Sequence, residues 1–113
     1  MKEPETMHDD DLAVALRALG HPVRLNILRI LAEKCDSNCC CADVTDCLPL
    51  AQSTVSQHIK VLLEAGLISR QSNGTRNRYT LNAPRIQALR AAHMTYLSSL
   101  ATPSGVGVLT ESN

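Results

Sequence analysis

Apolar residues recur at helical spacing through the first third of the chain. Leucines four and three residues apart predict a helix over residues 9–19, and Gly20 ends it. The proline of the His21–Pro22 pair suits the first position of a second helix, whose apolar stripe runs through Ala32. The chain is therefore expected to begin with two helices.

A shorter helical pattern and a longer one follow, separated by a proline turn. Residues 41–47 predict a short helix with Val44 and Leu48 facing inward. Ser53 is a good N-cap for the next helix, and Gly66 ends that helix in the left-handed conformation that glycine favours. The apolar positions that this longer helix should bury are Val55, Ile59, Leu62 and Leu63.

The stretch over residues 68–81 predicts a β-hairpin, because an Asn-Gly pair at its centre is a strong two-residue turn signal. A turn centred on that pair places Ile68 opposite Tyr79 on one face of the hairpin. It puts Arg76 and Arg78 together on the other face.

Three-four spacing of apolar residues after Pro84 predicts a final helix. The short helix, the tight turn and the longer helix form a helix-turn-helix, and the hairpin follows it as a wing. The expected fold class is mainly α with a small β-hairpin, a winged helix-turn-helix. Residues 9–101 should form this domain, with a flexible N-terminal tail over residues 1–8 and a disordered C-terminal tail over residues 102–113.

Composition narrows the classes of function. The 113 residues are 44% hydrophobic and include no Phe or Trp, so the core is aliphatic and offers no aromatic platform for single-stranded nucleic acid. No apolar run approaches the roughly 20 residues of a membrane span, and the acidic N-terminus is unlike a signal peptide. We therefore expect a cytoplasmic protein with no membrane partner. The net charge is zero, but residues 51–82 carry four cationic side chains against one acidic one, a local basic surface suited to phosphates.

The longer helix of the helix-turn-helix has a polar side suited to double-stranded DNA. Its outward side chains are short or carry amides, so they can approach base edges in the major groove and form hydrogen bonds there. His58 stands beside them, and Arg76 and Arg78 of the hairpin can touch a flanking phosphate or the minor groove. A solvated helix face, or a winged helix used only for protein contacts, is the alternative. The candidate DNA contacts on the helix are Gln52, Ser53, Thr54, Ser56, Gln57 and Lys60.

Three segments resemble the arsenic-repressor family, ArsR/SmtB. They are residues 18–28 (ALGHPVRLNIL), 50–62 (LAQSTVSQHIKVL) and 64–68 (EAGLI), within a likeness that covers roughly residues 10–100. The resemblance implies a homodimeric repressor that leaves its operator DNA when an inducer binds. Relatives that sense zinc use Asp and His pairs on the last helix. His93 stands alone there in this chain, so no zinc site is expected on that helix.

The five cysteines of the chain, at positions 35, 39, 40, 41 and 47, fall in one segment. In a reducing environment such a cluster indicates metal binding or redox sensing. Thiolates are soft ligands that select As(III), Sb(III), Cd(II), Cu(I) or Zn(II). Three of them suit the pyramidal geometry of As(III), and four would suit tetrahedral Zn or Cd. Consecutive residues often point in opposite directions, so Cys39 and Cys41 are the better pair. A third ligand would come from Cys35, Cys40 or Cys47, or from across a dimer, and no obligatory cofactor is expected.

Other interpretations of the cysteines stay open. Arsenic-sensing relatives carry Cys-x-Cys followed by Asp and an aliphatic residue, and residues 39–44 match that pattern with one extra residue, Ala42. An ion bound there should displace the short helix and, through its apolar contacts, the longer helix of the helix-turn-helix. A reversible disulfide or persulfide among the same thiols is the alternative signal, and Cys47 could be a small buried hydrophobe on the inner side of the short helix.

No enzyme is expected, because none of the four histidines has a recognisable catalytic partner.

A two-fold dimer is expected because a lone helix-turn-helix contacts only a few base pairs. The final helix offers an apolar seam, and the first helix could complete it. The alternative is that this stripe packs only within its own subunit. The candidate interface residues are Leu12, Leu16, Leu89, His93, Tyr96, Leu97 and Leu100.

Overall fold

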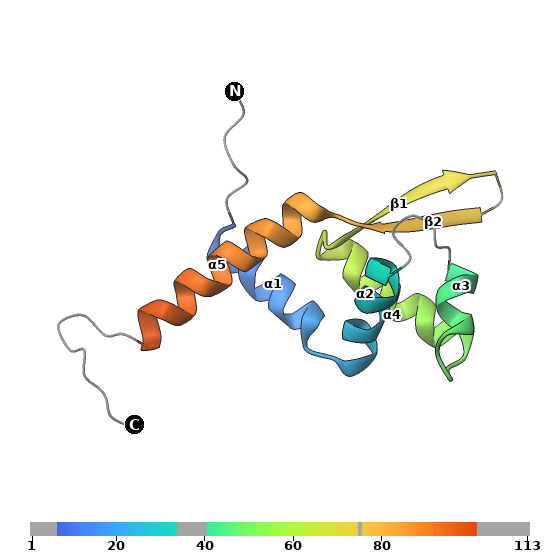
Figure 1. Cartoon of the computed structure of the whole chain (residues 1–113), viewed down its shortest axis with the longest axis horizontal. Helices are drawn as coiled ribbons and strands as arrows, with labels where there is room; N and C mark the ends of the chain where they lie inside the picture. Colours follow the sequence, from blue (N-terminus) through green and yellow to red (C-terminus); the bar gives the residue numbers. More distant parts are fainter. Residues whose placement is uncertain (1–6, 34–40, 75, 102–113) are drawn as a thin grey trace.

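The computed structural model describes residues 7–33, 41–74 and 76–101 (Figure 1). Within these ranges the order of elements is the predicted one, four helices followed by an antiparallel hairpin and a last helix. The structure is therefore mainly helical with a small hairpin, as the sequence predicts. The elements are α1 (Asp9–Leu19), α2 (Pro22–Glu33), α3 (Cys41–Asp46), α4 (Gln52–Glu64), β1 (Ile68–Asn73), β2 (Arg76–Leu81) and α5 (Ala83–Ala101).

The first two helices begin and end close to their predicted positions. α1 has the predicted bounds, and α2 begins at Pro22 and ends one residue beyond Ala32. The imidazole Nδ1 of His21 accepts a hydrogen bond from the N–H of Val23 at 3.1 Å. This bond satisfies one of the free N–H groups in the first turn of α2, so His21 helps to start the helix that the proline favours.

The helix-turn-helix is anchored by aliphatic side chains. α3 packs against both α2 and α4. Val44 of α3 and Val55 and Leu62 of α4 are fully buried, and each such burial contributes roughly 1.5–3 kcal/mol to folding. These contacts tie the position of α4 to that of the short helix before it.

The two ends of α4 are made differently. The prediction that Ser53 is the N-cap is wrong, because the backbone is already extended at Ala51 and the helix begins at Gln52 without a side-chain cap. The other end is as predicted. Gly66 has a φ of 77°, and the N–H groups of Gly66 and Leu67 donate to carbonyl groups one turn back. This left-handed stop turns the chain directly into β1.

The hairpin register differs from the predicted one. Ile68 lies opposite Leu81, and Tyr79 lies opposite Arg70, so the predicted direct pairing of Ile68 with Tyr79 is wrong. The reason is that Gly74, with a φ of 68°, is the residue that follows the last strand pair, so the turn is centred one position later. The shift leaves Ile68 and Tyr79 on the same face, because partners move by two positions.

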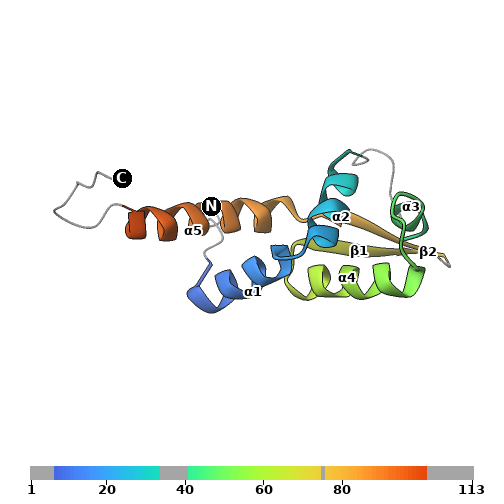
Figure 2. The same cartoon turned by 90° about the horizontal axis from the view of Figure 1, so that it is seen from below.

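α5 extends away from the rest of the molecule (Figures 1 and 2). Its first half lies beside α1, whereas its C-terminal half has no other element next to it in either view. The N-terminal end of α4 and the tip of the hairpin lie at the opposite end of the molecule, near α3 (Figure 2). In the described ranges, no helix combines the length and the apolar character needed to cross a bilayer.

Candidate nucleic-acid interface

Helix α4 has one buried side and one exposed side. The predicted inward residues Val55, Ile59 and Leu62 are at most 2% exposed. On the other side, five of the predicted DNA contacts are exposed to solvent, and they are Gln52, Ser53, Ser56, Gln57 and Lys60. An exposed helix face of amide and hydroxyl side chains with one lysine can form hydrogen bonds with base edges and an ion pair with a phosphate.

Two other predicted contacts on α4, Thr54 and His58, are half-buried. The imidazole of His58 faces the protein. Its Nδ1 lies 3.2 Å from Nη1 of Arg24, and its ring centroid lies 4.4 Å from that of His21. Burial, then the nearby His21 and then the charge of Arg24 lower the pKa of His58 below its ordinary value. In this structure His58 therefore joins α4 to α2.

The hairpin forms the wing beside α4. On the backbone, Arg76 lies opposite Asn73 and Arg78 lies opposite Gln71. Gln71 and Arg70 of β1 are exposed, and Arg78 is half-buried. The side chain of Arg76 lies outside the described residues.

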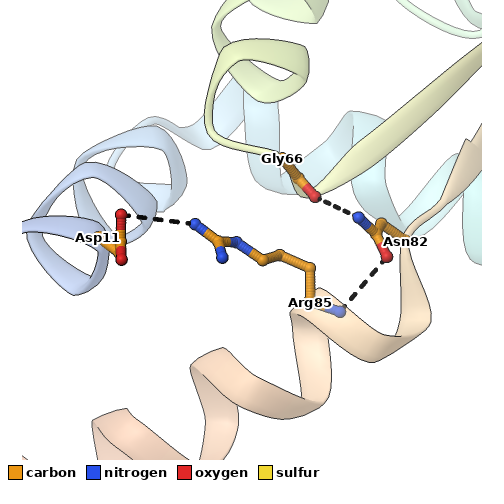
Figure 3. Close-up of polar contacts among 4 residues, drawn as sticks. All are labelled: Asp11, Gly66, Asn82 and Arg85. Carbon is orange, nitrogen blue, oxygen red and sulfur yellow. Dashed lines mark hydrogen bonds and ion pairs between the residues drawn. The ribbon is translucent and has the colours of Figure 1, made fainter. Parts of the chain in front are cut away.

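Two residues that the sequence reasoning missed attach the hairpin to α5 and α1 (Figure 3). The amide of Asn82 donates to the carbonyl oxygen of Gly66 at 2.9 Å, and its Oδ1 accepts the N–H of Arg85 at 3.3 Å, which caps the first turn of α5. Arg85 Nη2 lies 3.8 Å from a carboxylate oxygen of Asp11 on α1. An asparagine directly before a helix that starts Ala-Pro is a capping signal that could have revealed this contact.

Most of the predicted cysteine cluster lies outside the described residues. This is true of Cys35, Cys39 and Cys40, and of the side chain of Cys41, whose backbone begins α3. Cys47 directly follows α3 and is an exposed free thiol, so its interpretation as a buried hydrophobe is wrong. Among the residues that the structure does describe, no three His, Cys, Asp or Glu side chains gather as a metal site.

The candidate dimer residues fall into two groups. Leu12 and Leu89 are only 7% and 6% exposed and belong to the core of the subunit, which leaves them little surface to give to a partner. Leu16 and His93 are half-buried. The remaining three candidates lie on the projecting half of α5 and are about half exposed: Tyr96 (47%), Leu97 (46%) and Leu100 (58%).

Known proteins resemble this chain in sequence and in structure. The family model for bacterial regulatory proteins of the arsR family matches residues 21–70. The chain is 34% identical over 77 residues to an uncharacterized HTH-type transcriptional regulator of Methanocaldococcus jannaschii, which covers 68% of this chain and 84% of that protein. It is 34% identical over 73 residues to the arsenical resistance operon repressor of Bacillus subtilis, covering 65% and 68%. A solved homodimeric winged helix-turn-helix DNA-binding domain from Mycobacterium bovis has a TM-score of 0.63 at 22% identity, covering 80% of this chain and 82% of that one.

The helix-turn-helix of α3 and α4, followed by the β1–β2 wing, defines the fold as a winged helix-turn-helix. The family match and the curated relatives define its class as a transcriptional regulator. Its relatives are transcriptional regulators and not enzymes, which confirms the expectation from the sequence that the protein is not an enzyme. The chain belongs to the arsR family of bacterial regulatory proteins.

Proposed function

We propose that the protein is a repressor that binds double-stranded operator DNA through the exposed face of α4, with the wing contacting the adjacent backbone. The observation that carries this proposal is the division of α4 into a fully buried aliphatic side and an exposed side of Gln, Ser and Lys residues. A helix exposed only to solvent usually carries Glu and Lys instead. The exposed side of α4 matches what the major groove accepts.

The proposed contact of α4 with base edges, its reading role, is tested with two DNA duplexes. One is selected by this protein from a random-sequence pool, and the other is a scrambled duplex of the same composition. Gln57→Ala should weaken binding to the selected duplex about fivefold to a hundredfold with little effect on the scrambled one, because a good base contact contributes about 1–3 kcal/mol. Lys60→Ala should weaken binding to both duplexes. It should also reduce the slope of log K against log salt concentration by about one, because one phosphate contact is lost. Fluorescence anisotropy at several salt concentrations measures both effects.

The matched control is Gln87→Ala, the same substitution at an exposed position near the start of α5. It should bind both duplexes like the wild type. If Gln57→Ala and Gln87→Ala had the same affinity for the selected duplex, α4 would not read base edges.

We further propose that the repressor acts as a homodimer, held by the projecting half of α5. Three exposed apolar side chains on this half, Tyr96, Leu97 and Leu100, have no covering element in the described part of the subunit. The solved relative from Mycobacterium bovis is homodimeric. A two-fold pair places two α4 helices on one operator, which is how helix-turn-helix proteins gain enough contact.

We also propose that a thiophilic ion, As(III) first among Sb(III), Cd(II) and Zn(II), releases the protein from DNA by binding the cysteine segment. The arsenical resistance operon repressor of Bacillus subtilis supports an arsenical signal. Because α3 packs on α4, a force on α3 reaches the reading helix. A coupling of about 1.4–2.8 kcal/mol is enough to weaken DNA binding tenfold to a hundredfold.

The structure bears on the choice of thiols. Cys41 is the first residue of α3 and Cys47 directly follows its last residue, so the six-residue helix, about 9 Å long, separates the two positions. One ion with sulfur bonds of about 2.3 Å does not easily hold both while α3 stays folded. The favoured site is therefore Cys39 and Cys41 with a third thiolate from Cys35, Cys40 or the other subunit.

The sensing proposal is tested by titrating reduced protein with As(III), Cd(II) and Zn(II) and following sulfur-to-metal absorption. Cys39→Ser or Cys41→Ser should abolish the As(III) signal and the release of DNA, and Cys47→Ser should leave both unchanged. Loss of the signal in Cys47→Ser alone would refute the proposed ligand set. If none of the three ions released DNA, but mild peroxide did so with an internal disulfide seen by mass spectrometry, the signal would be an oxidant.

A further inference from the structure

The side chain of Arg24 connects α2 to the two helices on either side of it in the fold. Its Nε donates to the carbonyl oxygen of Ala18 at 2.6 Å, and its Nη2 donates to that of Arg17 at 3.3 Å. Both carbonyls belong to the last turn of α1, whose negative end favours a cation, and the carbonyl of Arg17 also accepts the N–H of Gly20 at 3.1 Å. The third nitrogen, Nη1, lies 3.2 Å from Nδ1 of His58 on α4. Arg24 thus links the end of α1 to the reading helix.

The contact with Arg24 requires one protonation state of His58. A guanidinium has only donors, so the Nδ1 of His58 must accept the hydrogen bond and carry no proton. A protonated imidazole would set donor against donor and cation against cation. In the described part of the chain, the charged or titratable groups that act on this ring are His21 and Arg24. His21 directly precedes α2, and Arg24 lies in its first turn. From α1, the carbonyl oxygens of Arg17 and Ala18 accept from Arg24. The charged residues Arg17 and Glu64 line the hollow beside this contact together with Arg24.

We propose that the Arg24–His58 contact is a proton-sensitive latch that holds α4 in the orientation needed for specific DNA binding, and that acid opens it. This inference rests on the proposed reading role of α4. His58 directly follows Gln57, one of the exposed candidate contacts, so a shift at His58 moves the reading face. A hollow of about 400 Å³ between α1, α2 and α4 is lined by Arg24 and gives the guanidinium space to move when the contact breaks.

The latch predicts a particular change in DNA binding at low pH. Protonation adds positive charge, so attraction to phosphates in general is not weakened by acid. Specific binding depends on the position of α4 and should fall. The ratio of affinities for the selected and the scrambled duplex is therefore the quantity to measure. The lowered pKa of His58 is consistent with a contact that is closed near neutral pH.

The experiment measures both duplexes by anisotropy at a series of pH values from about 8 down to about 5, because the pKa of His58 lies below the ordinary histidine value, at one ionic strength and with a chelator and a reductant. The wild-type ratio should fall about threefold to tenfold in acid. His58→Gln keeps an oxygen acceptor for Arg24 but does not titrate, so its ratio should change less than about twofold. His8→Gln, an exposed histidine before α1, is the matched control and should behave like the wild type.

Two results separate failure of the latch from failure of the reading role. If the wild type binds the selected duplex specifically at about pH 8 but His58→Gln has the same pH dependence, the latch is wrong and the reading role stands. If the wild type binds both duplexes equally at pH 8, the reading role fails.

The latch itself is then still decided by NMR titration of the imidazole nitrogens in the wild-type protein, which also serves if His58→Gln does not fold. We expect His58 to stay unprotonated at Nδ1 at neutral pH and the amide signals of α4 to shift as it titrates. A His58 that is protonated at neutral pH, or that titrates without a change in α4, would overturn the proposal.

Discussion

The side chain of Asn82 makes two hydrogen bonds and its backbone N–H makes another, and together they join three parts of the molecule. Its side chain caps α5 and holds the carbonyl of Gly66, which lies in the turn between the reading helix and the wing. Its own N–H donates to the carbonyl of Leu67 at 2.9 Å. A single residue therefore fixes where the wing ends, where α5 starts and how both meet the end of α4.

Asn82→Ala should lower the free energy of unfolding by about 1–3 kcal/mol, because it removes an N-cap and leaves the half-buried Gly66 carbonyl without this donor. Asn82→Ser keeps a cap oxygen but loses the amide donor, so its loss should be smaller. Urea denaturation followed by circular dichroism measures both. The control Asn77→Ala, at an exposed position on β2, should change stability by less than about 0.5 kcal/mol, and an equal loss there would contradict the role of Asn82.

At the scale of elements, the helices could be predicted where the pattern is local. The bounds of α1, the start of α2 and three of the four predicted buried positions of α4 follow from apolar spacing and a proline, and they match the structure. The fourth position, Leu63, is half-buried. The hairpin register could not be predicted, because it depends on which position of the turn Gly74 occupies. Gly74 directly follows the last strand pair, Asn73 with Arg76, so it is the first residue of the turn and not the second. The contact of His58 with Arg24 joins residues 34 positions apart, which no local pattern reveals.

The α2–α4 contact should make folding stability depend on pH. Burial, His21 and Arg24 lower the pKa of His58 in the folded protein, so the fold disfavours the protonated ring. The contribution of His58 to the free energy of unfolding is therefore complete above about pH 6.5, the ordinary histidine pKa, and it declines as the pH falls below that value. Between about pH 7.5 and pH 5 the Tm of the wild type should fall about 2–5 °C more than that of His58→Gln. Parallel Tm curves for the two proteins would show that His58 is not linked to folding.

At the scale of the whole molecule, the proposed DNA-binding surface and the proposed dimer interface lie at opposite ends. The N-terminal end of α4 and the tip of the wing lie at one end, and the projecting half of α5 lies at the other (Figure 2). The sequence indicated the exposed apolar residues of α5, but it could not separate them from Leu12 and Leu89, which the fold uses for its own core. That distinction depends on how α1 and α5 pack, and periodicity within one helix does not contain it.

Leu97→Glu should convert a dimer into a monomer, because it places a charge in the proposed apolar seam, where Leu97 is 46% exposed in the isolated subunit. Binding to the selected duplex should weaken at least about tenfold, since one subunit loses its second half-site. Analytical ultracentrifugation measures the mass, and anisotropy measures the affinity. Ser98→Glu, an exposed neighbour on the same helix, is the control. A Leu97→Glu protein that stays dimeric would place the interface elsewhere.

α3 has six residues, and a helix this short has almost no stability of its own in water. It keeps its shape because Val44 and Leu48 are buried, while the residues proposed to contact DNA lie on α4 and the wing. Under the proposed function, the cysteine segment can therefore change while the residues proposed to contact DNA stay the same. Descendants of one ancestor could in this way come to respond to a different thiophilic ion at an unchanged operator.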